Sequence, residues 1–132
     1  MNGKNVVLQH ALSLQLDAAA DGFDWPEALD LFDKIAEELG ELRVELESES
    51  MDVVRTLDEL GDVLFCVVNL ARKLQLDPSE ALAVANRKFE RRYGYVRKYL
   101  HEFPTIGDPA RLASMEARWQ EAKTKEKHGE LE

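Results

Sequence analysis

The feature that most constrains this chain is an apolar repeat of three and four residues, which recurs in five segments. Such spacing lines up side chains on one face of an α-helix, which turns once every 3.6 residues. No segment alternates apolar and polar residues over the length of a strand, and no hairpin dipeptide joins two apolar runs. The sequence therefore predicts an all-α fold, a helical bundle of about five helices.

Short breaks at glycine, proline or polar residues separate the predicted helices. Asp77 can cap the fourth helix and Pro78 suits its first position, and Asp108 and Pro109 repeat this start signal for the fifth. The residues after the fifth helix, 126–132, are expected to fray. The predicted helices cover about residues 5–20, 26–47, 53–74, 78–100 and 109–125.

Length and charge narrow the class of protein. The chain has 132 residues, so we expect a single domain spanning residues 1–132. Its net charge of −9 argues against a DNA or RNA surface, because phosphate backbones require clustered Lys and Arg. The longest apolar run, residues 63–68, is far shorter than the roughly 20 residues of a membrane span. Residues 1–7 show no export signal and Cys66 is the single cysteine, so we expect a cytoplasmic protein.

The second and third predicted helices each carry a pair of carboxylates three residues apart. Glu38 and Glu41 form the first pair, and Glu59 and Asp62 form the second. Side chains at this spacing project from one face of a helix. Because the break between the helices is short, the helices are expected to form an antiparallel pair that turns at Ser50. Ser50 lies midway in sequence between Glu38 and Asp62, and also midway between Glu41 and Glu59. We therefore expect Glu38 to lie opposite Asp62, and Glu41 to lie opposite Glu59, across the helix pair.

Four converging carboxylates repel one another unless something neutralises them. Protonation through raised pKa values is one solution. A divalent cation that prefers oxygen ligands, Mg²⁺ or Mn²⁺, is another. A third interpretation is a solvated acidic face without a ligand. The pattern alone leaves these alternatives open.

Basic and aromatic residues near the C-terminus could contact a phosphorylated ligand. Lys88 and Arg92 lie one turn apart on the fourth helix and would suit phosphate groups, although they could equally serve solubility. On the fifth helix, Trp119 fits core packing or stacking on a base, and Lys123 lies one turn further on.

The ordered set of motifs resembles the MazG-type nucleoside triphosphate pyrophosphohydrolases, and within them the C-terminal catalytic domain. The resemblance covers nearly the whole chain. It rests on the acidic motifs at 37–41 and 59–62 and on the segments 22–25, 33–34, 63–65, 68–72, 86–92, 115–116 and 119–120.

This resemblance implies a member of the all-α NTP pyrophosphatase superfamily, whose subunits commonly combine as homodimers or higher homo-oligomers. It implies Mg²⁺-dependent hydrolysis of nucleoside triphosphates to monophosphate and pyrophosphate by an activated water, in nucleotide-pool house-cleaning or regulation. A phosphoribosyl-ATP pyrophosphohydrolase-like enzyme and a non-catalytic acidic interaction module with the same fold are the alternatives.

The resemblance also assigns roles to individual residues. The implied metal ligands are Glu38, Glu41, Glu59 and Asp62, with Glu37 as an auxiliary carboxylate that positions or deprotonates water. The implied substrate contacts are Lys34, Arg55, Lys88, Arg92, Trp119 and Lys123. Arg55 replaces the lysine that the family pattern leads us to expect, which keeps the charge and changes the geometry.

Overall fold

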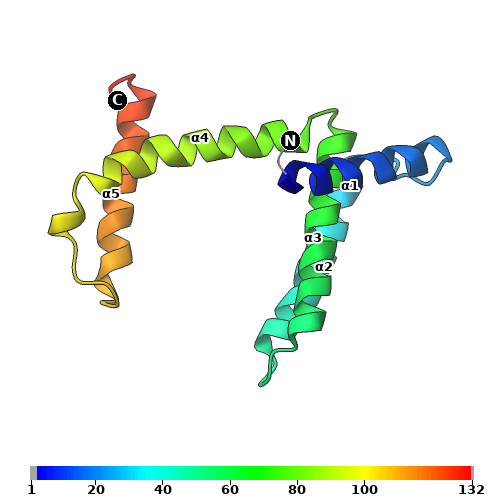
Figure 1. The fold of residues 1–132 in the computed structure, drawn as a ribbon, viewed down its shortest axis with the longest axis horizontal. Coiled ribbons are helices and arrows are strands. Elements are labelled where there is room, and N and C mark those ends of the chain that lie inside the picture. The colour runs from blue at the N-terminus through cyan, green and yellow to red at the C-terminus, as the bar shows by residue number, and fades with distance from the viewer. Residues whose placement is uncertain (1–2, 132) are drawn as a thin grey trace. The chain divides into compact units, whose positions relative to one another are not determined.

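The structure, a computed structural model, describes residues 3–131 and contains only helices over that range (Figure 1). The all-α prediction is therefore confirmed. The elements are α1 (Gly3–Ala20), α2 (Asp30–Glu47), α3 (Val53–Lys73), α4 (Pro78–Arg97), the short 3-10 helix η1 (Leu100–Glu102) and α5 (Ala110–Lys127).

The predicted helix ends are wrong in three places. α2 begins at Asp30 and not near residue 26, because the N–H groups of residues 30–32 donate to carbonyls three residues back, as in a turn, and not four residues back. α4 ends at Arg97, and η1 takes over shortly afterwards. α5 continues to Lys127 and so includes the first residues of the segment that we expected to fray.

The chain divides into two compact units, residues 1–81 and 82–132. The first holds α1, α2, α3 and the start of α4, and the second holds the rest of α4, η1 and α5. The single domain expected from the length stays a prediction.

In the first unit, α2 and α3 pack side by side as an antiparallel pair, and α1 packs on α3 (Figure 1). Asp52 begins α3 as its N-cap, since its carboxylate accepts hydrogen bonds from the N–H groups of Val54 (3.0 Å) and Arg55 (3.1 Å). Leu31 of α2 and Val68 of α3 are buried between the elements. The helix pair is therefore fixed by a capped turn at one end and by buried apolar residues near the other end.

Asp24 ties the loop after α1 to the end of α3. Its carboxylate pairs with the Arg72 guanidinium and lies 3.4 Å from the Lys73 Nζ. It also accepts a hydrogen bond from the Trp25 N–H at 2.7 Å. Because the Arg72 side chain is only 9% exposed, this ion pair is sheltered from water.

The second unit is held together by aromatic and charged side chains. Trp119 of α5 packs on Phe89 of α4, with 5.6 Å between ring centroids, and the Arg92 guanidinium lies 5.7 Å from the Trp119 ring. Glu126 accepts from Arg92 at 3.0 Å and from Arg91 at 3.3 Å. The packing interpretation of Trp119 therefore has direct support in this unit.

The α2–α3 pair leaves many large apolar side chains exposed. On α3 the residues spaced by three and four form one stripe, in which Leu57 is 69% exposed and Leu64 is 58% exposed. A matching stripe of exposed apolar residues runs along α2. The α3 stripe consists of Leu57, Leu60, Leu64 and Val67, and the α2 stripe of Phe32, Leu39 and Leu46. No helix among the described residues is long and apolar enough to cross a bilayer.

Candidate metal centre

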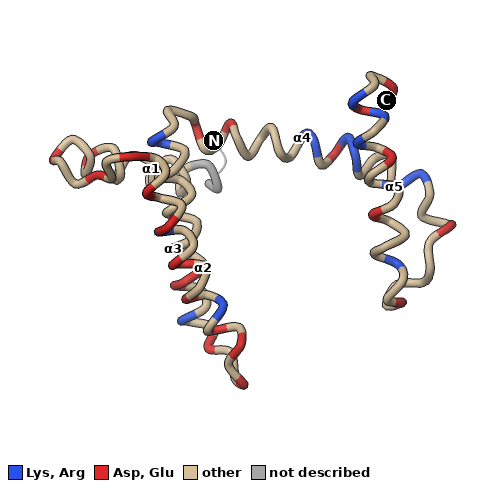
Figure 2. Tube along the Cα trace, turned by 180° about the vertical axis from the view of Figure 1, so that it is seen from behind, with Lys and Arg blue, Asp and Glu red and all other residues tan. Residues whose placement is uncertain are grey.

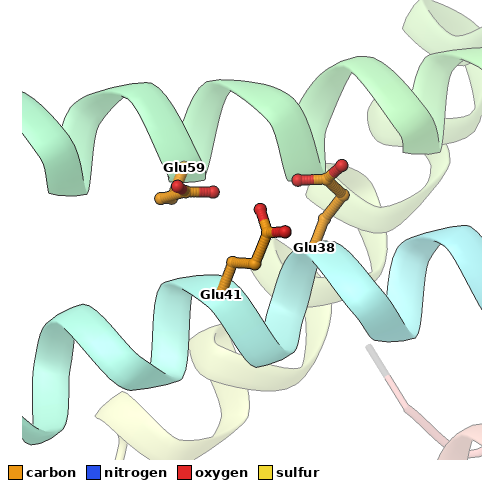
Figure 3. Close-up of side chains that lie close together, drawn as sticks. All are labelled: Glu38, Glu41 and Glu59. Atoms are coloured by element: carbon orange, nitrogen blue, oxygen red, sulfur yellow. The ribbon is translucent and has the colours of Figure 1, made fainter.

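Three carboxylates meet between α2 and α3. Each of Glu38, Glu41 and Glu59 offers a carboxylate oxygen, and these oxygens all lie within 4.8 Å of one another. Figure 3 shows the Glu38 and Glu41 side chains rising from α2 toward α3, with Glu59 facing them from α3. The arrangement follows from the sequence, because the three-residue spacing aligns the first two on one face and the hairpin register brings Glu59 opposite.

Asp62 lies close to this cluster without belonging to the group of three. Burial raises the pKa of Asp62, and the negative charges of Asp58 and then Glu38 raise it further. Its role as a fourth ligand stays a prediction.

The cluster carries the electrostatic strain expected of like charges. Burial raises the pKa of Glu59, and the neighbouring Glu41 carboxylate raises it further, followed by the charges of Asp62 and Asp58. The sequence analysis missed Asp58 as a contributor. Its signal was available, since Asp58 lies four residues before Asp62 and shares its helix face.

The hydrogen-bond partners of the buried carboxylate oxygens indicate whether a cation would fit the cluster. Lys34 Nζ lies 3.0 Å from one oxygen of the buried Glu38, and Glu38 raises the pKa of Lys34 in return. The other Glu38 oxygen is buried with no hydrogen-bond partner among the described residues, as is one oxygen of Glu59. Two orphaned carboxylate oxygens and a third carboxylate nearby are a donor set that suits a hard divalent cation.

The surroundings of the cluster are acidic. Figure 2 shows acidic residues distributed along both helices of the α2–α3 pair. Glu37 is exposed beside the cluster and lies 3.6 Å from Lys34 Nζ. Arg55, near the turn, is exposed and lies 4.0 Å from Asp52. The structure thus places Glu37 and Lys34 at the cluster and Arg55 nearer the start of α3.

The remaining predicted substrate contacts belong to the second unit. Lys88 and Lys123 are exposed, whereas Trp119 is half-buried against Phe89. Arg92 is engaged with Glu126 and leaves its Nε buried without a partner among the described residues. The contact of these second-unit residues with the carboxylate cluster stays a prediction.

A cavity of about 510 Å³ in the first unit, lined by α1, the loop after it, α2 and α3, was not predicted from the sequence. Gln15, which is buried on α1, and Asn69, on α3, both line it. No local pattern singles out a lone glutamine on a helix, so only the packing of α1 on α3 identifies this residue.

Comparison with known proteins gives the same family as the acidic motifs. The family model described as the MazG nucleotide pyrophosphohydrolase domain matches residues 26–97, which include all four predicted metal ligands. The chain belongs to the MazG nucleotide pyrophosphohydrolase family.

Two bacterial relatives match most of the chain. The nucleoside triphosphate pyrophosphohydrolase/pyrophosphatase MazG of Thermotoga maritima is 34% identical over 116 residues, 88% of this chain and 44% of that protein. The nucleoside triphosphate pyrophosphohydrolase of Escherichia coli K12 is 36% identical over 119 residues, 90% of this chain and 45% of that protein. The chain therefore spans a little under half the length of these curated relatives.

Proposed function

We propose that this protein hydrolyses nucleoside triphosphates to nucleoside monophosphate and pyrophosphate in a Mg²⁺-dependent reaction. The observation that carries the proposal is the convergence of Glu38, Glu41 and Glu59, with two buried oxygens lacking partners, in a domain of this family. The names of the Thermotoga maritima and Escherichia coli relatives support the reaction.

Glu38, Glu41 and Glu59 would hold the metal, with Asp62 as the fourth ligand. Bound Mg²⁺, or Mn²⁺ in its place, would neutralise phosphate oxygens and favour the ionised form of an attacking water. Burial, followed by the neighbouring carboxylates, raises the pKa values of Glu59 and Asp62, and this supports the assignment because a bound cation would stabilise their ionised forms.

The chain's own side chains would orient the attacking water and the substrate. Glu37, which is exposed and neighbours Glu38 in the chain, would position a water or accept its proton. The water oxygen forms a bond to phosphorus, the bond to the bridging anhydride oxygen breaks, and pyrophosphate leaves with that electron pair. No covalent bond to the enzyme is required.

Basic residues would neutralise the negative charge of the triphosphate. Lys34 already pairs with Glu38 and could turn to a phosphate oxygen, and Arg55 lies on the same helix pair. Lys88 and Arg92 of the second unit would add phosphate contacts, Arg92 by exchanging Glu126 for phosphate. Trp119 and Lys123 would lie near the nucleoside or its phosphates.

We also propose that the protein works as a homodimer or a higher homo-oligomer in the cytoplasm. The exposed apolar stripes of α2 and α3 support self-association, because large apolar faces mark protein interfaces. The substrate is a nucleotide and not a nucleic acid polymer or a membrane, in agreement with the net charge of −9.

Pyrophosphate release from ribo- and deoxynucleoside triphosphates, measured with Mg²⁺ and with chelator, tests the reaction. We expect metal-dependent release that falls by about a hundredfold or more in Glu59→Gln, because one ligand and one charge are lost. Glu49→Gln, an exposed carboxylate in the turn, is the matched control and should retain activity. No release from any triphosphate, phosphoribosyl-ATP included, would overturn the proposal.

A further inference from the structure

Lys34 supplies the positive charge that lies against the carboxylate cluster. Its Nζ lies 3.0 Å from Glu38 Oε1 and 3.6 Å from Glu37 Oε1. Within the range that the structure describes, no other basic side chain lies within 4.0 Å of a carboxylate oxygen of Glu38, Glu41 or Glu59. A single ammonium is therefore set against a group of three carboxylates.

The pairing of Lys34 with Glu38 follows from their spacing on α2. The two residues lie four positions apart, so their side chains meet on the same face of the helix. The Glu38 side chain is only 9% exposed, and its Oε2 has no hydrogen-bond partner among the described residues. A buried carboxylate is costly without a positive partner. The Lys34 ammonium therefore acts as the counter-ion of Glu38.

Lys34 and a divalent cation would compete for the same carboxylate. Both are positive, so a cation held by Glu38 would repel an ammonium paired with that group. Lys34 cannot join the site as a ligand either, because an ammonium donates hydrogen bonds and has no lone pair to offer a metal. Binding of a metal to Glu38 therefore favours departure of the ammonium.

The surroundings of Lys34 allow its side chain to leave Glu38. The side chain is 32% exposed. It lines two cavities, the one of about 510 Å³ and a second of about 420 Å³ that is also lined by Trp25, Asp30 and Asp33. A lysine carries its charge on a flexible alkyl stem, so the ammonium can change partners without movement of α2.

We propose that Lys34 is an exchangeable counter-ion, which pairs with Glu38 until the metal binds and then turns to a phosphate oxygen of the nucleotide. The inference rests on the proposed function and adds the coupling between its two ligands. Without a nucleotide, the displaced ammonium loses its partner, and this cost weakens metal binding. With a triphosphate present the ammonium gains a new partner, so each ligand strengthens the binding of the other.

Calorimetric titration of the Lys34→Met variant tests the exchange, because the two ligands should respond in opposite directions. Titrated with Mg²⁺ alone, the variant should bind about tenfold more tightly than the unaltered protein, since the competing charge is gone. At saturating Mg²⁺, it should bind an α,β-methylene nucleoside triphosphate about tenfold more weakly, since one phosphate contact is lost. The methylene bridge resists cleavage, so the readout is binding and not turnover. A general structural defect would weaken both.

Arg43→Met is the matched control. Arg43 also lies on α2 and pairs with the residue four positions on, since its Nε lies 2.6 Å from Glu47 Oε1. The variant removes the same charge and the same kind of ion pair from a side chain that is 79% exposed and outside the cluster. It should bind both ligands as the unaltered protein does. Lys34→Arg keeps the charge and should not gain affinity for Mg²⁺.

A second variant keeps the test valid where Lys34→Met folds poorly. Lys34→Gln carries no charge, but its amide can still donate to the buried carboxylate of Glu38. It should therefore bind Mg²⁺ alone more tightly than the unaltered protein, as Lys34→Met does. Gains of equal size in Lys34→Gln and Lys34→Arg would overturn the inference, because charge would then not be the cause.

The remaining outcomes separate this inference from the proposed function. If the unaltered protein binds Mg²⁺ neither alone nor with the nucleotide, the proposed function fails. If it binds both, and the uncharged Lys34 variants bind Mg²⁺ no more tightly than Arg43→Met, only the exchange is refuted. Weaker binding of both ligands by these variants would also refute the exchange, because that result marks a structural role for Lys34.

Discussion

Two carboxylates of the first unit have pKa values displaced in opposite directions, and the cause lies in their neighbours. Asp24 faces cations, chiefly Arg72, which lower its pKa to about 2. Glu59 faces burial and the carboxylate of Glu41, which raise its pKa. The pairing of Asp24 with cations stabilises the folded chain at neutral pH. The burial of Glu59 beside Glu41 disfavours the ionised form of Glu59, and a bound cation would stabilise that form.

Asp24 should make the protein sensitive to acid. Its folded-state pKa lies below the unfolded value, so its contribution is present above about pH 4 and is lost as the pH falls toward 2. Asp24→Asn should lower the Tm by a few degrees at pH 7 and by less near pH 2, in melts followed by circular dichroism. Asp21→Asn, in the same loop, is the control. Equal losses at both pH values would contradict the prediction.

Glu59 should behave in the opposite way in chelator. Its folded-state pKa lies above the ordinary value of 4.5, so its ionisation costs stability as the pH rises above that value. Glu59→Gln without Mg²⁺ should therefore melt at the same temperature or higher at pH 7, and added Mg²⁺ should stabilise it less than the unaltered protein. Clear destabilisation of this variant in chelator, compared with Glu49→Gln, would count against a repelling cluster.

At the scale of elements, the turn between α2 and α3 controls the site. The carboxylates come from both helices, so they meet only when the turn at residues 48–52 sets the register. The Asp52 cap starts α3 at Val53, and the Ser48 hydroxyl donates to the Ser50 carbonyl at 2.8 Å inside the turn. A cap far from any ligand thus supports the geometry of the cluster.

Removing the cap should loosen the helix pair. Asp52→Ala should reduce the free energy of unfolding by about 1 kcal/mol, because the N–H groups of Val54 and Arg55 lose their acceptor. Urea unfolding measures this change. Asp52→Asn keeps an acceptor oxygen and is the control, so a loss of similar size in both variants would show that the cap is not the cause.

At the scale of the whole molecule, the exposed apolar stripes of the α2–α3 pair are the feature that bears on oligomeric state. A chain of this size rarely exposes aligned leucines over several helical turns. A second copy that packs its own α2–α3 pair against these stripes would bury them and enclose the carboxylates between helices.

Size-exclusion chromatography with light scattering measures the mass of the protein in solution and so tests the proposed oligomeric state. We expect the unaltered protein to be a dimer or larger, and Leu64→Glu to shift it toward the monomer, because a charge in an apolar interface is costly. Leu112→Glu changes an exposed leucine of the second unit and should leave the mass unchanged. A monomeric unaltered protein, or a Leu64→Glu variant of full mass, would contradict the proposed association.

The sequence alone determined the helices, their approximate ends and the register of Glu38, Glu41 and Glu59. These features depend on neighbours along the chain, since helix periodicity and a short turn act over a few residues. The family assignment followed from the same local motifs.

Only the tertiary structure decided the rest, because it depends on contacts between residues far apart in the chain. Asp24 finds Arg72 across 48 positions, and Gln15 finds the Phe65 carbonyl across 50. Such contacts fix which atom of each side chain is left unpaired, and no local pattern encodes this. The orphaned oxygens of Glu38 and Glu59 and the acceptor of Gln15 therefore emerged only when the helices were packed together.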